Sequence, residues 1–336
     1  MVPVAGAGQS RGMRLLVLGG SGFVGRAVAD EAVARGHEVT VFNRGRRPAP
    51  AGVRTLIGDR QRPQALETAE TWDAVVDTWS AAGEVVGITA RLLRGRASHL
   101  TYVSSRSVYE WGTPSPLDES SPLLDAAEPG YGGDKLRGEL AAAEFGGPVL
   151  LARAGLILGP YEDVGRLPWW LNRLHRGGPT LAPGPQHAGV QYIDARDLAI
   201  FVIEAARSGV AGPVNLVSRP AHTTMGEILA IGNEVTGNHA ELRWTDAERI
   251  EAAGIEGWTQ LPIWLPPGPG YDFMNQADVT RALDAGLRCR PVRETITDTW
   301  AWLRQTSGDA PQRADRSRVG VDPEVEAKAL EPDRLP

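Results

Sequence analysis

The sequence is poor in cysteine and in metal-binding patterns. Cys289 is the only cysteine among the 336 residues, which excludes an intramolecular disulfide framework and any zinc cluster built on cysteine thiolates. The six histidines are scattered without the spacing of metal ligands, so we expect no metal site. No apolar run approaches the roughly 18 residues that a membrane-spanning helix needs. We therefore expect a soluble protein of the cytoplasm.

An excess of positive charge is also missing. The chain carries 35 lysines and arginines against 41 acidic residues, for a formal net charge of −6. Nucleic-acid binding is driven largely by neutralising phosphates, so this balance disfavours a nucleic-acid partner and favours a small-molecule substrate. Residues 1–12 lack the apolar stretch and cleavage site of a signal peptide and are expected to form a flexible extension.

Strand-like and helix-like segments alternate through the first half of the chain. This alternation predicts an α/β fold with a doubly wound parallel sheet of the Rossmann type. The predicted segments are Arg14–Leu18, Phe23–Arg35, Glu38–Phe42, Val53–Gly58, Gln64–Glu70, Ala74–Asp77, Glu84–Leu93, His99–Ser104, Tyr131–Glu144 and Val149–Arg153.

We expect four regions along the chain. After the N-terminal extension, the Rossmann core occupies 13–160 and a smaller substrate-binding lobe occupies 161–306, from which about 190–217 returns to the core. The final stretch, 307–336, is charged, contains proline and lacks aromatics, which predicts a disordered tail with at most a short helix near Glu324–Leu330.

A glycine pattern follows the first predicted strand and opens the first predicted helix. Gly19, Gly22 and Gly25 lack a Cβ, so the backbone can turn tightly and approach a pyrophosphate at the helix N-terminus. With Phe23 and Val24 they form the predicted dinucleotide site. The alternative is a merely structural turn.

The end of the second predicted strand indicates which dinucleotide binds. An NAD enzyme usually places an acidic residue there to hold the ribose 2′-hydroxyl, but the chain has Asn43 followed by Arg44, Arg46 and Arg47. Guanidinium groups can bind a 2′-phosphate, so we predict NADP(H) rather than NAD(H). A solvated basic loop is the alternative. Asp59 is a candidate acceptor for the adenine amino group, or part of a surface turn.

Lysine is almost absent, and this scarcity singles out one position. Only Lys135 and Lys328 are lysines, and only Lys135 lies outside the expected tail. Lys135 follows Tyr131 by four residues, which places both side chains on one helix face. A tyrosine can transfer protons near neutral pH when a nearby ammonium stabilises its phenolate. Ser105, with Ser104 and Ser107 as competitors, is expected to bind the substrate oxygen.

Taken together, these motifs resemble the short-chain dehydrogenase/reductase superfamily, specifically its extended and atypical branch, also called the NAD-dependent epimerase/dehydratase family. The resemblance covers about 13–303 and includes the glycine motif, residues 103–109, 131–135, 153–160 and 191–197. It implies that Tyr131 is the general acid/base, that Lys135 lowers the tyrosine pKa and holds the nicotinamide ribose, and that Ser105 orients the substrate carbonyl. It also implies a homodimer paired through helices 84–93 and 131–144.

Departures from the family pattern narrow the expected reaction. Arg106 and Ser107 follow Ser105 where sugar-nucleotide dehydratases of the family carry an Asp-Glu pair. We therefore expect a ketoreductase that reduces a carbonyl group of a small metabolite. Bulky aromatic compounds and sugar-like compounds are the candidate classes. The alternatives are a sugar epimerase and a non-catalytic NADP-sensing or RNA-associated protein. Trp169 and Trp170 are candidates for the wall of the substrate pocket.

Overall fold

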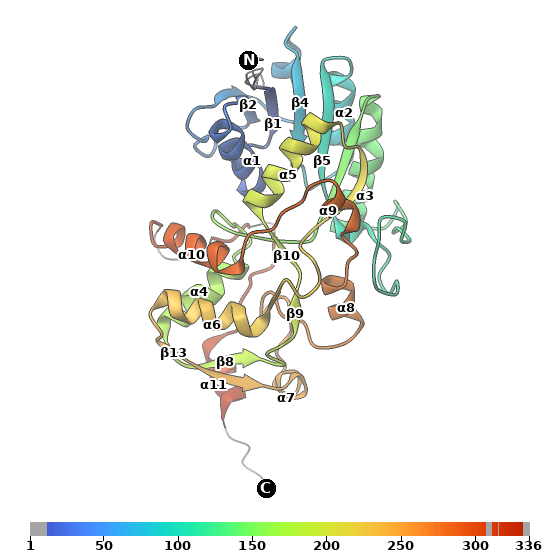
Figure 1. Cartoon of the computed structure of the whole chain (residues 1–336). Helices are drawn as coiled ribbons and strands as arrows, with labels where there is room; N and C mark the ends of the chain where they lie inside the picture. Colours follow the sequence, from blue (N-terminus) through green and yellow to red (C-terminus); the bar gives the residue numbers. More distant parts are fainter. Residues whose placement is uncertain (1–11, 307–310, 315, 332–336) are drawn as a thin grey trace, which may run out of the picture.

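A seven-stranded parallel sheet forms the larger part of the molecule. The computed structural model describes residues 12–306, 311–314 and 316–331. The strands are ordered β11-β6-β5-β4-β1-β2-β3, and every neighbouring pair is parallel. Their bounds are β1 Arg14–Leu18, β2 Glu38–Asn43, β3 Arg54–Ile57, β4 Trp72–Asp77, β5 Ala97–Ser105, β6 Val149–Ala154 and β11 Gly212–Leu216. The predicted Rossmann sheet is thereby confirmed (Figure 1).

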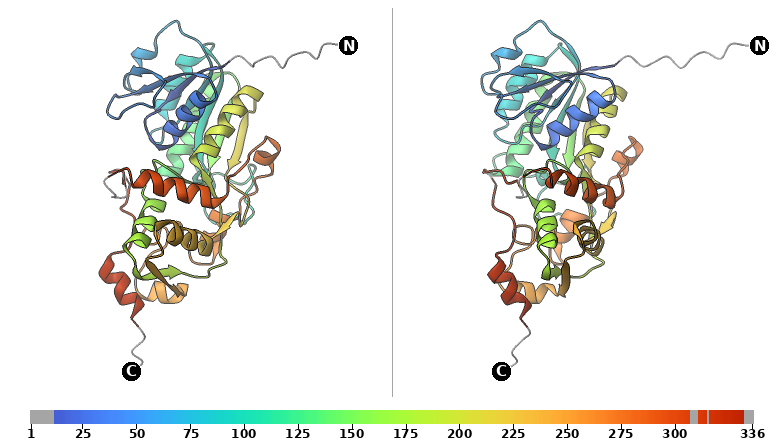
Figure 2. Two further views of the ribbon diagram at one scale, coloured as in Figure 1. Left: turned by 60° about the vertical axis from the view of Figure 1, so that its left-hand side comes forward. Right: turned by 90° about the vertical axis from the view of Figure 1, so that its left-hand side faces the viewer.

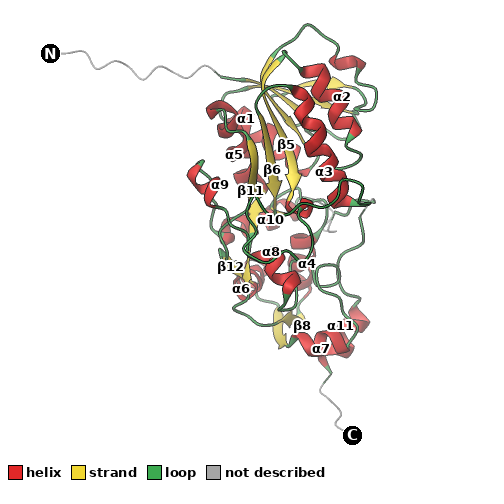
Figure 3. Ribbon diagram, turned by 90° about the vertical axis from the view of Figure 1, so that its right-hand side faces the viewer, coloured by secondary structure: helices red, strands yellow, loops and turns green. Residues whose placement is uncertain are grey.

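Two pairs of helices cover the two faces of the sheet, as Figure 3 shows. Helices α1 (Phe23–Ala34) and α5 (Ala195–Ser208) pack together on one face, and α2 (Glu84–Leu93) and α3 (Tyr131–Ala142) on the other. Side chains of β1 alternate between these layers, because successive residues of a strand point to opposite faces. Leu15 and Val17 join the α1/α5 core, whereas Leu16 and Leu18 join the α2/α3 core.

One expected helix of the core does not form. Only a 3-10 turn, Gln64–Leu66, occupies the segment Gln64–Glu70. The carbonyl groups of Leu66 and Glu70 instead accept hydrogen bonds from the Arg96 guanidinium, at 2.8 and 3.2 Å. A side chain thus satisfies backbone acceptors that a helix would otherwise have used.

The second lobe has its own hydrophobic core below the carboxyl ends of the strands. The helices of this lobe are α4 Arg166–Arg176, α6 Met225–Thr236, α7 Ala247–Ala252, α8 Pro269–Asn275, α10 Val292–Leu303 and α11 Pro323–Leu330, whereas α9 Thr280–Asp284 packs against β11 of the large sheet. Its short strands are β7 Leu156–Leu158, β8 Gly178–Pro183, β9 Gly189–Val190, β10 Tyr192–Asp194, β12 Thr223–Thr224 and β13 Ala240–Thr245. In the Rossmann core, 3-10 turns at Arg106–Val108 and Ala143–Phe145 follow β5 and α3. Helices α4, α6 and α10 pack around Trp170, Leu171, Leu229 and Ile296.

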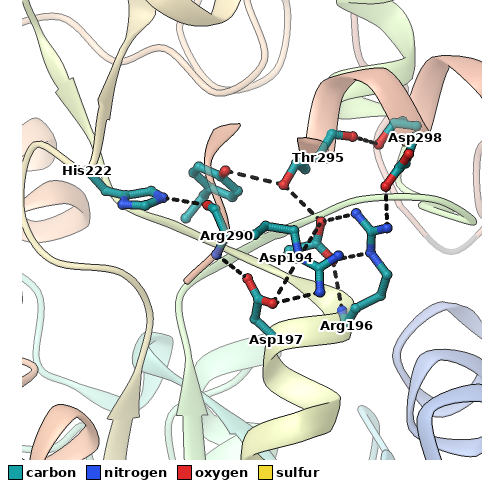
Figure 4. Close-up of polar contacts among 9 residues, drawn as sticks. Asp194, Arg196, Asp197, His222, Arg290, Thr295 and Asp298 are labelled. Atoms are coloured by element: carbon teal, nitrogen blue, oxygen red, sulfur yellow. Dashed lines mark hydrogen bonds and ion pairs between the residues drawn. The ribbon is translucent and has the colours of Figure 1, made fainter. Parts of the chain in front are cut away.

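A polar network joins the two lobes where β10 leads into α5 (Figure 4). The buried carboxylate of Asp194 caps α5 by accepting from the backbone N–H of Arg196 at 2.9 Å, and it also accepts from the Thr295 hydroxyl of α10 at 2.8 Å. Asp197 accepts from the backbone N–H and from Nε of Arg290, at 2.8 and 2.9 Å. Helix α10 is therefore fixed to the helix that covers the sheet.

The C-terminal region packs against the second lobe instead of forming the disordered tail that we expected, and the short helix expected near Glu324–Leu330 is present as α11. Residues 311–314 and 316–331 lie along the second lobe and end in α11 (Figure 2). The segment carries no aromatic side chain, but it buries the carboxylate of Glu326, which accepts from Arg173 Nε at 2.7 Å and from the Leu181 N–H at 3.1 Å. Residues 1–11, 307–310, 315 and 332–336 of the expected extension and tail lie outside the described residues.

We predict that Glu326→Gln lowers the free energy of unfolding by about 3–5 kcal/mol, because it leaves the buried Arg173 guanidinium without its counter-charge. Chemical denaturation measures this change. The matched control is Glu324→Gln, which alters an exposed residue of the same helix and should change stability by about 0.5 kcal/mol or less. Equal, small effects of both variants would show that α11 does not dock in solution.

Candidate active site

The loop between β1 and α1 is shaped to hold a phosphate group. Gly19 has a φ of 102°, a left-handed conformation that favours glycine. A Cβ on Gly25 would lie 2.4 Å from the Gly19 carbonyl oxygen, so only glycine allows the helix to approach the loop this closely. Gly22 caps α1 without a side-chain hydrogen bond, and no acidic residue lies in the first turn. The first N–H groups of α1 are thus left for an anion, and these residues fit a dinucleotide pyrophosphate.

At the end of β2, the predicted arginines differ in their contacts. The Arg47 guanidinium lies 3.0 Å from the Asp163 carboxylate, in an ion pair that joins this loop to the second lobe. Arg44 and Arg46 are exposed, and neither forms an ion pair with a residue that the structure describes. Arg44 and Arg46 are therefore the better candidates for contact with a 2′-phosphate.

The other two candidate residues near the adenosine end make local turns. Asn43 Oδ1 accepts from the Gly45 N–H at 2.7 Å, while its buried Nδ2 has no partner among the described residues. Asp59 is exposed, and its carboxylate accepts from the Gln61 N–H at 2.9 Å. Asn43 thus retains a free donor, and Asp59 lies in a surface turn.

The structure brings Tyr131 and Lys135 together on the first turns of α3. Lys135 is 3% exposed, and its ammonium donates to the carbonyl groups of Trp79 and Val103, both at 2.6 Å. The Lys135 nitrogen lies 6.0 Å from the centre of the Tyr131 ring. Burial lowers the pKa of Lys135 to about 7, and the negative charge of Asp77 opposes this shift. Two of the three ammonium protons are held by backbone, which leaves one for a ligand.

The three serines at the end of β5 and in the turn after it make different contacts. Ser104 donates to the buried carboxylate of Glu139 at 2.6 Å, and that carboxylate also pairs with Arg153. The Ser105 hydroxyl donates to the Ser107 hydroxyl and accepts from the Ser107 N–H, both at 3.1 Å. All three serines border the cavity beside Tyr131, but the Ser104 hydroxyl is committed to Glu139 of α3.

A cavity of about 580 Å³ connects the glycine loop with the Tyr131/Lys135 pair and the second lobe. Its far side is largely apolar and is lined by Trp111, Leu124, Trp258, Phe273 and Met274. The expected pocket residues Trp169 and Trp170 do not line it. Trp170 is buried and donates to the Pro262 carbonyl at 2.6 Å, and Trp169 packs against it with ring centres 4.7 Å apart.

Several residues at the site were not singled out from the sequence. Thr78 and Ser80 follow β4 and line the cavity, and the carboxylate of Asp77 makes a buried two-pronged contact with Arg60 at 2.6 and 2.9 Å. Their place after a buried strand adjoining β1 is a signal that could have found them, because ligands bind at the carboxyl ends of such strands. Arg166, Arg313 and Arg316 also line the cavity, and no local pattern marks them.

A model of the NAD dependent epimerase/dehydratase family matches residues 15–217. The chain belongs to this family. It is 34% identical over 205 residues to the 2′-dehydrokanamycin reductase of Streptomyces kanamyceticus, and the match spans 57% of each chain. It is 30% identical over 245 residues to the 2-alkyl-3-oxoalkanoate reductase of Stenotrophomonas maltophilia, over 65% of this chain and 74% of that one.

Solved structures of the epimerase/dehydratase family share the fold. The UDP-glucose 4-epimerase of Thermus thermophilus in complex with NAD superposes with a TM-score of 0.63 at 20% identity, covering 87% of this chain and 99% of that one. The family predicted from the motifs is confirmed. Among the described residues, none of the helices combines the length and the apolar character that crossing a bilayer requires.

We predict that buried Lys135 gives the cofactor-free protein a distinctive pH dependence of stability. The folded-state pKa of about 7 lies below the usual 10.5, so the unfolded chain binds more protons between these pH values and the free energy of unfolding rises with pH. Lys135→Met removes this contribution, so the difference in unfolding free energy, wild type minus variant, should increase from pH 7 to pH 10.5. Denaturant titrations across this range measure it.

The control is Lys328→Met, which removes the only other lysine, an exposed residue of α11. Its difference from wild type should stay level over the same pH range. If the Lys135→Met difference also stays level, the amine is not desolvated in the folded protein.

Proposed function

We propose that the protein is an NADPH-dependent ketoreductase that reduces the carbonyl group of a small metabolite. The observation that carries this proposal is the common cavity. It is bordered by the glycine loop, by Tyr131, Lys135 and Ser105, and by apolar side chains of the loop 110–129 and of the second lobe. The names of the two curated relatives support reduction as the reaction.

In this mechanism the nicotinamide, when bound, supplies the hydride. The hydroxyl groups of Ser105 and Tyr131 donate to the substrate carbonyl oxygen and stabilise the negative charge that develops there. Tyr131 then gives its proton to that oxygen. The ammonium of Lys135, held by the carbonyls of Trp79 and Val103, stabilises the resulting phenolate electrostatically.

Aromatic side chains from the second lobe and from the loop after β5 line the substrate side of the cavity. Trp258 lies beside the guanidinium of Arg166, with 4.9 Å from Cζ to the ring centre, and Trp111 packs on Phe273 with ring centres 4.8 Å apart. Apolar walls lower the local dielectric, which strengthens the hydrogen bonds from Ser105 and Tyr131 to the reacting oxygen.

We predict that Tyr131→Phe lowers turnover by about 100-fold or more, because it removes the proton donor. NADPH binding should be unchanged, since the ring and the packing of α3 remain. The assay follows NADPH absorbance with a panel of oxo acids, aromatic ketones and oxidised sugars, and fluorescence titration gives the NADPH affinity.

Tyr271→Phe is the control, because the Tyr271 hydroxyl donates to the Gly189 carbonyl away from the cavity. Unchanged turnover in Tyr131→Phe would remove this residue from the mechanism. Interconversion of sugar epimers without net NADPH consumption would replace the reductase proposal with the epimerase.

The exposed arginines after β2 support NADP(H) as the cofactor. We predict that Arg44→Ala weakens NADPH binding about tenfold, the effect of a lost charge-assisted contact, and leaves NADH binding nearly unchanged. Fluorescence titration of both cofactors tests this. Arg35→Ala, at the opposite end of α1 from the glycine loop, is the control for a general change in surface charge. Equal losses for NADPH and NADH would show that Arg44 does not contact the 2′-phosphate.

A further inference from the structure

The C-terminal strap, defined here as residues 311–314 and 316–321, forms part of the cavity wall. The backbone N–H of Arg313 donates to the Asp163 carbonyl at 2.9 Å, and that of Gly320 donates to the Thr259 carbonyl at 2.8 Å. Val319 and Val321 are buried against the second lobe. Figure 2 shows the chain beyond α10 running along this lobe toward α11. The strap therefore has a fixed path between the catalytic helix and the end of the molecule.

The strap places the guanidinium group of Arg316 beside the ring of Tyr131. The Cζ atom of Arg316 lies 4.4 Å from the centre of the Tyr131 ring. Arg166, at the start of α4, approaches from the second lobe, and its buried Nε has no hydrogen-bond partner in the described part of the chain. Neither guanidinium forms a hydrogen bond or an ion pair with a carboxylate of the residues described. Burial lowers the pKa of Arg166, the charge of Glu162 opposes this shift, and the positive charge of Arg316 adds to it.

The cavity holds more positive than negative charge. Among the described residues, its cationic lining is Arg106, Lys135, Arg166, Arg313 and Arg316, and its acidic lining is Glu128 and Asp163. Asp163 is paired with Arg47, and Glu128 is exposed at the edge. Glu162 lies near Arg166, but its carboxylate accepts from the backbone N–H groups of Arg166 and Leu167, and burial raises its pKa to about 7. Like charges brought together in this way are stabilised by an anionic ligand.

We infer that Arg166 and Arg316 bind the carboxylate of an oxo acid substrate whose carbonyl group lies beside Tyr131 and Ser105. The inference rests on the proposed reductase function and adds the substrate class. Planar guanidinium groups match a carboxylate in geometry. Because Arg316 lies against the Tyr131 ring, the carboxylate is only a few bonds from the carbonyl that is reduced, as in a β-oxo acid. Leu124, Phe273 and Met274 then provide apolar surface for a hydrocarbon chain.

A binding experiment tests this without requiring turnover. The full-length protein, saturated with NADP⁺, is titrated calorimetrically with β-hydroxyoctanoate, the reduced form of such a substrate, and with its uncharged methyl ester. We expect the acid to bind wild type about tenfold or more tightly than the ester, and Arg316→Gln to remove most of this preference without weakening the ester. Arg318→Gln, an exposed arginine of the strap outside the cavity lining, should keep the full preference.

Three results would overturn the inference. One is equal binding, or no binding, of acid and ester to wild type. Another is the same loss of preference in Arg318→Gln, which would indicate a general effect of strap charge. The third is a weaker affinity of Arg316→Gln for NADPH with the preference for the acid intact, because the anion would then be a cofactor phosphate.

The experiments distinguish a failure of the oxo acid inference from a failure of the reductase proposal. Reduction of ketones without any preference for the acid would keep the reductase and overturn the oxo acid. Binding of the acid that depends on Arg316, in a protein that never consumes NADPH, would keep the carboxylate site and overturn the reductase.

Discussion

Burial of one ammonium group is the constraint on which the site depends. Removing an amine from water costs several kcal/mol unless other dipoles replace the lost hydration. In this chain the carbonyl groups of Trp79 and Val103, at the ends of β4 and β5, supply those dipoles to Lys135. The same contacts fix α3 against the sheet, and so they set where the Tyr131 ring stands relative to Ser105 and the glycine loop. A compact ammonium suits this two-carbonyl site, in a chain whose only other lysine is Lys328.

The second lobe supplies part of the cavity wall that the sheet and its helices do not supply. The Rossmann core presents the glycine loop and the Tyr131/Lys135 pair at the carboxyl ends of its strands. Helix α4 brings Arg166, the loop before α8 brings Trp258, and the strap brings Arg316, and all three face the cavity from segments far apart in the sequence. The network around Asp194 holds these segments in place, because it ties α10, just before the strap, to α5 on the sheet.

Local patterns were sufficient for the parts of the molecule whose contacts are local. The glycine loop, the alternating strands and the Tyr131/Lys135 spacing were predictable because each depends on residues that lie close together in the sequence. The helix expected at Gln64–Glu70 failed because Arg96, distant in sequence, satisfies its carbonyl groups. The tail was expected to be disordered because composition does not reveal that Glu326 meets Arg173. Trp169 and Trp170 were misplaced for a similar reason, since only the packed lobe decides which tryptophans face a cavity.

Asp163 connects separate parts of the molecule. Its carboxylate holds Arg47 beside the predicted 2′-phosphate site, and its carbonyl group holds the backbone of the strap. One residue thus bridges three segments of the chain, with its side chain on the loop after β2 and its main chain on the strap. Removing the side chain would release Arg47 and leave the main-chain hydrogen bond to Arg313 in place.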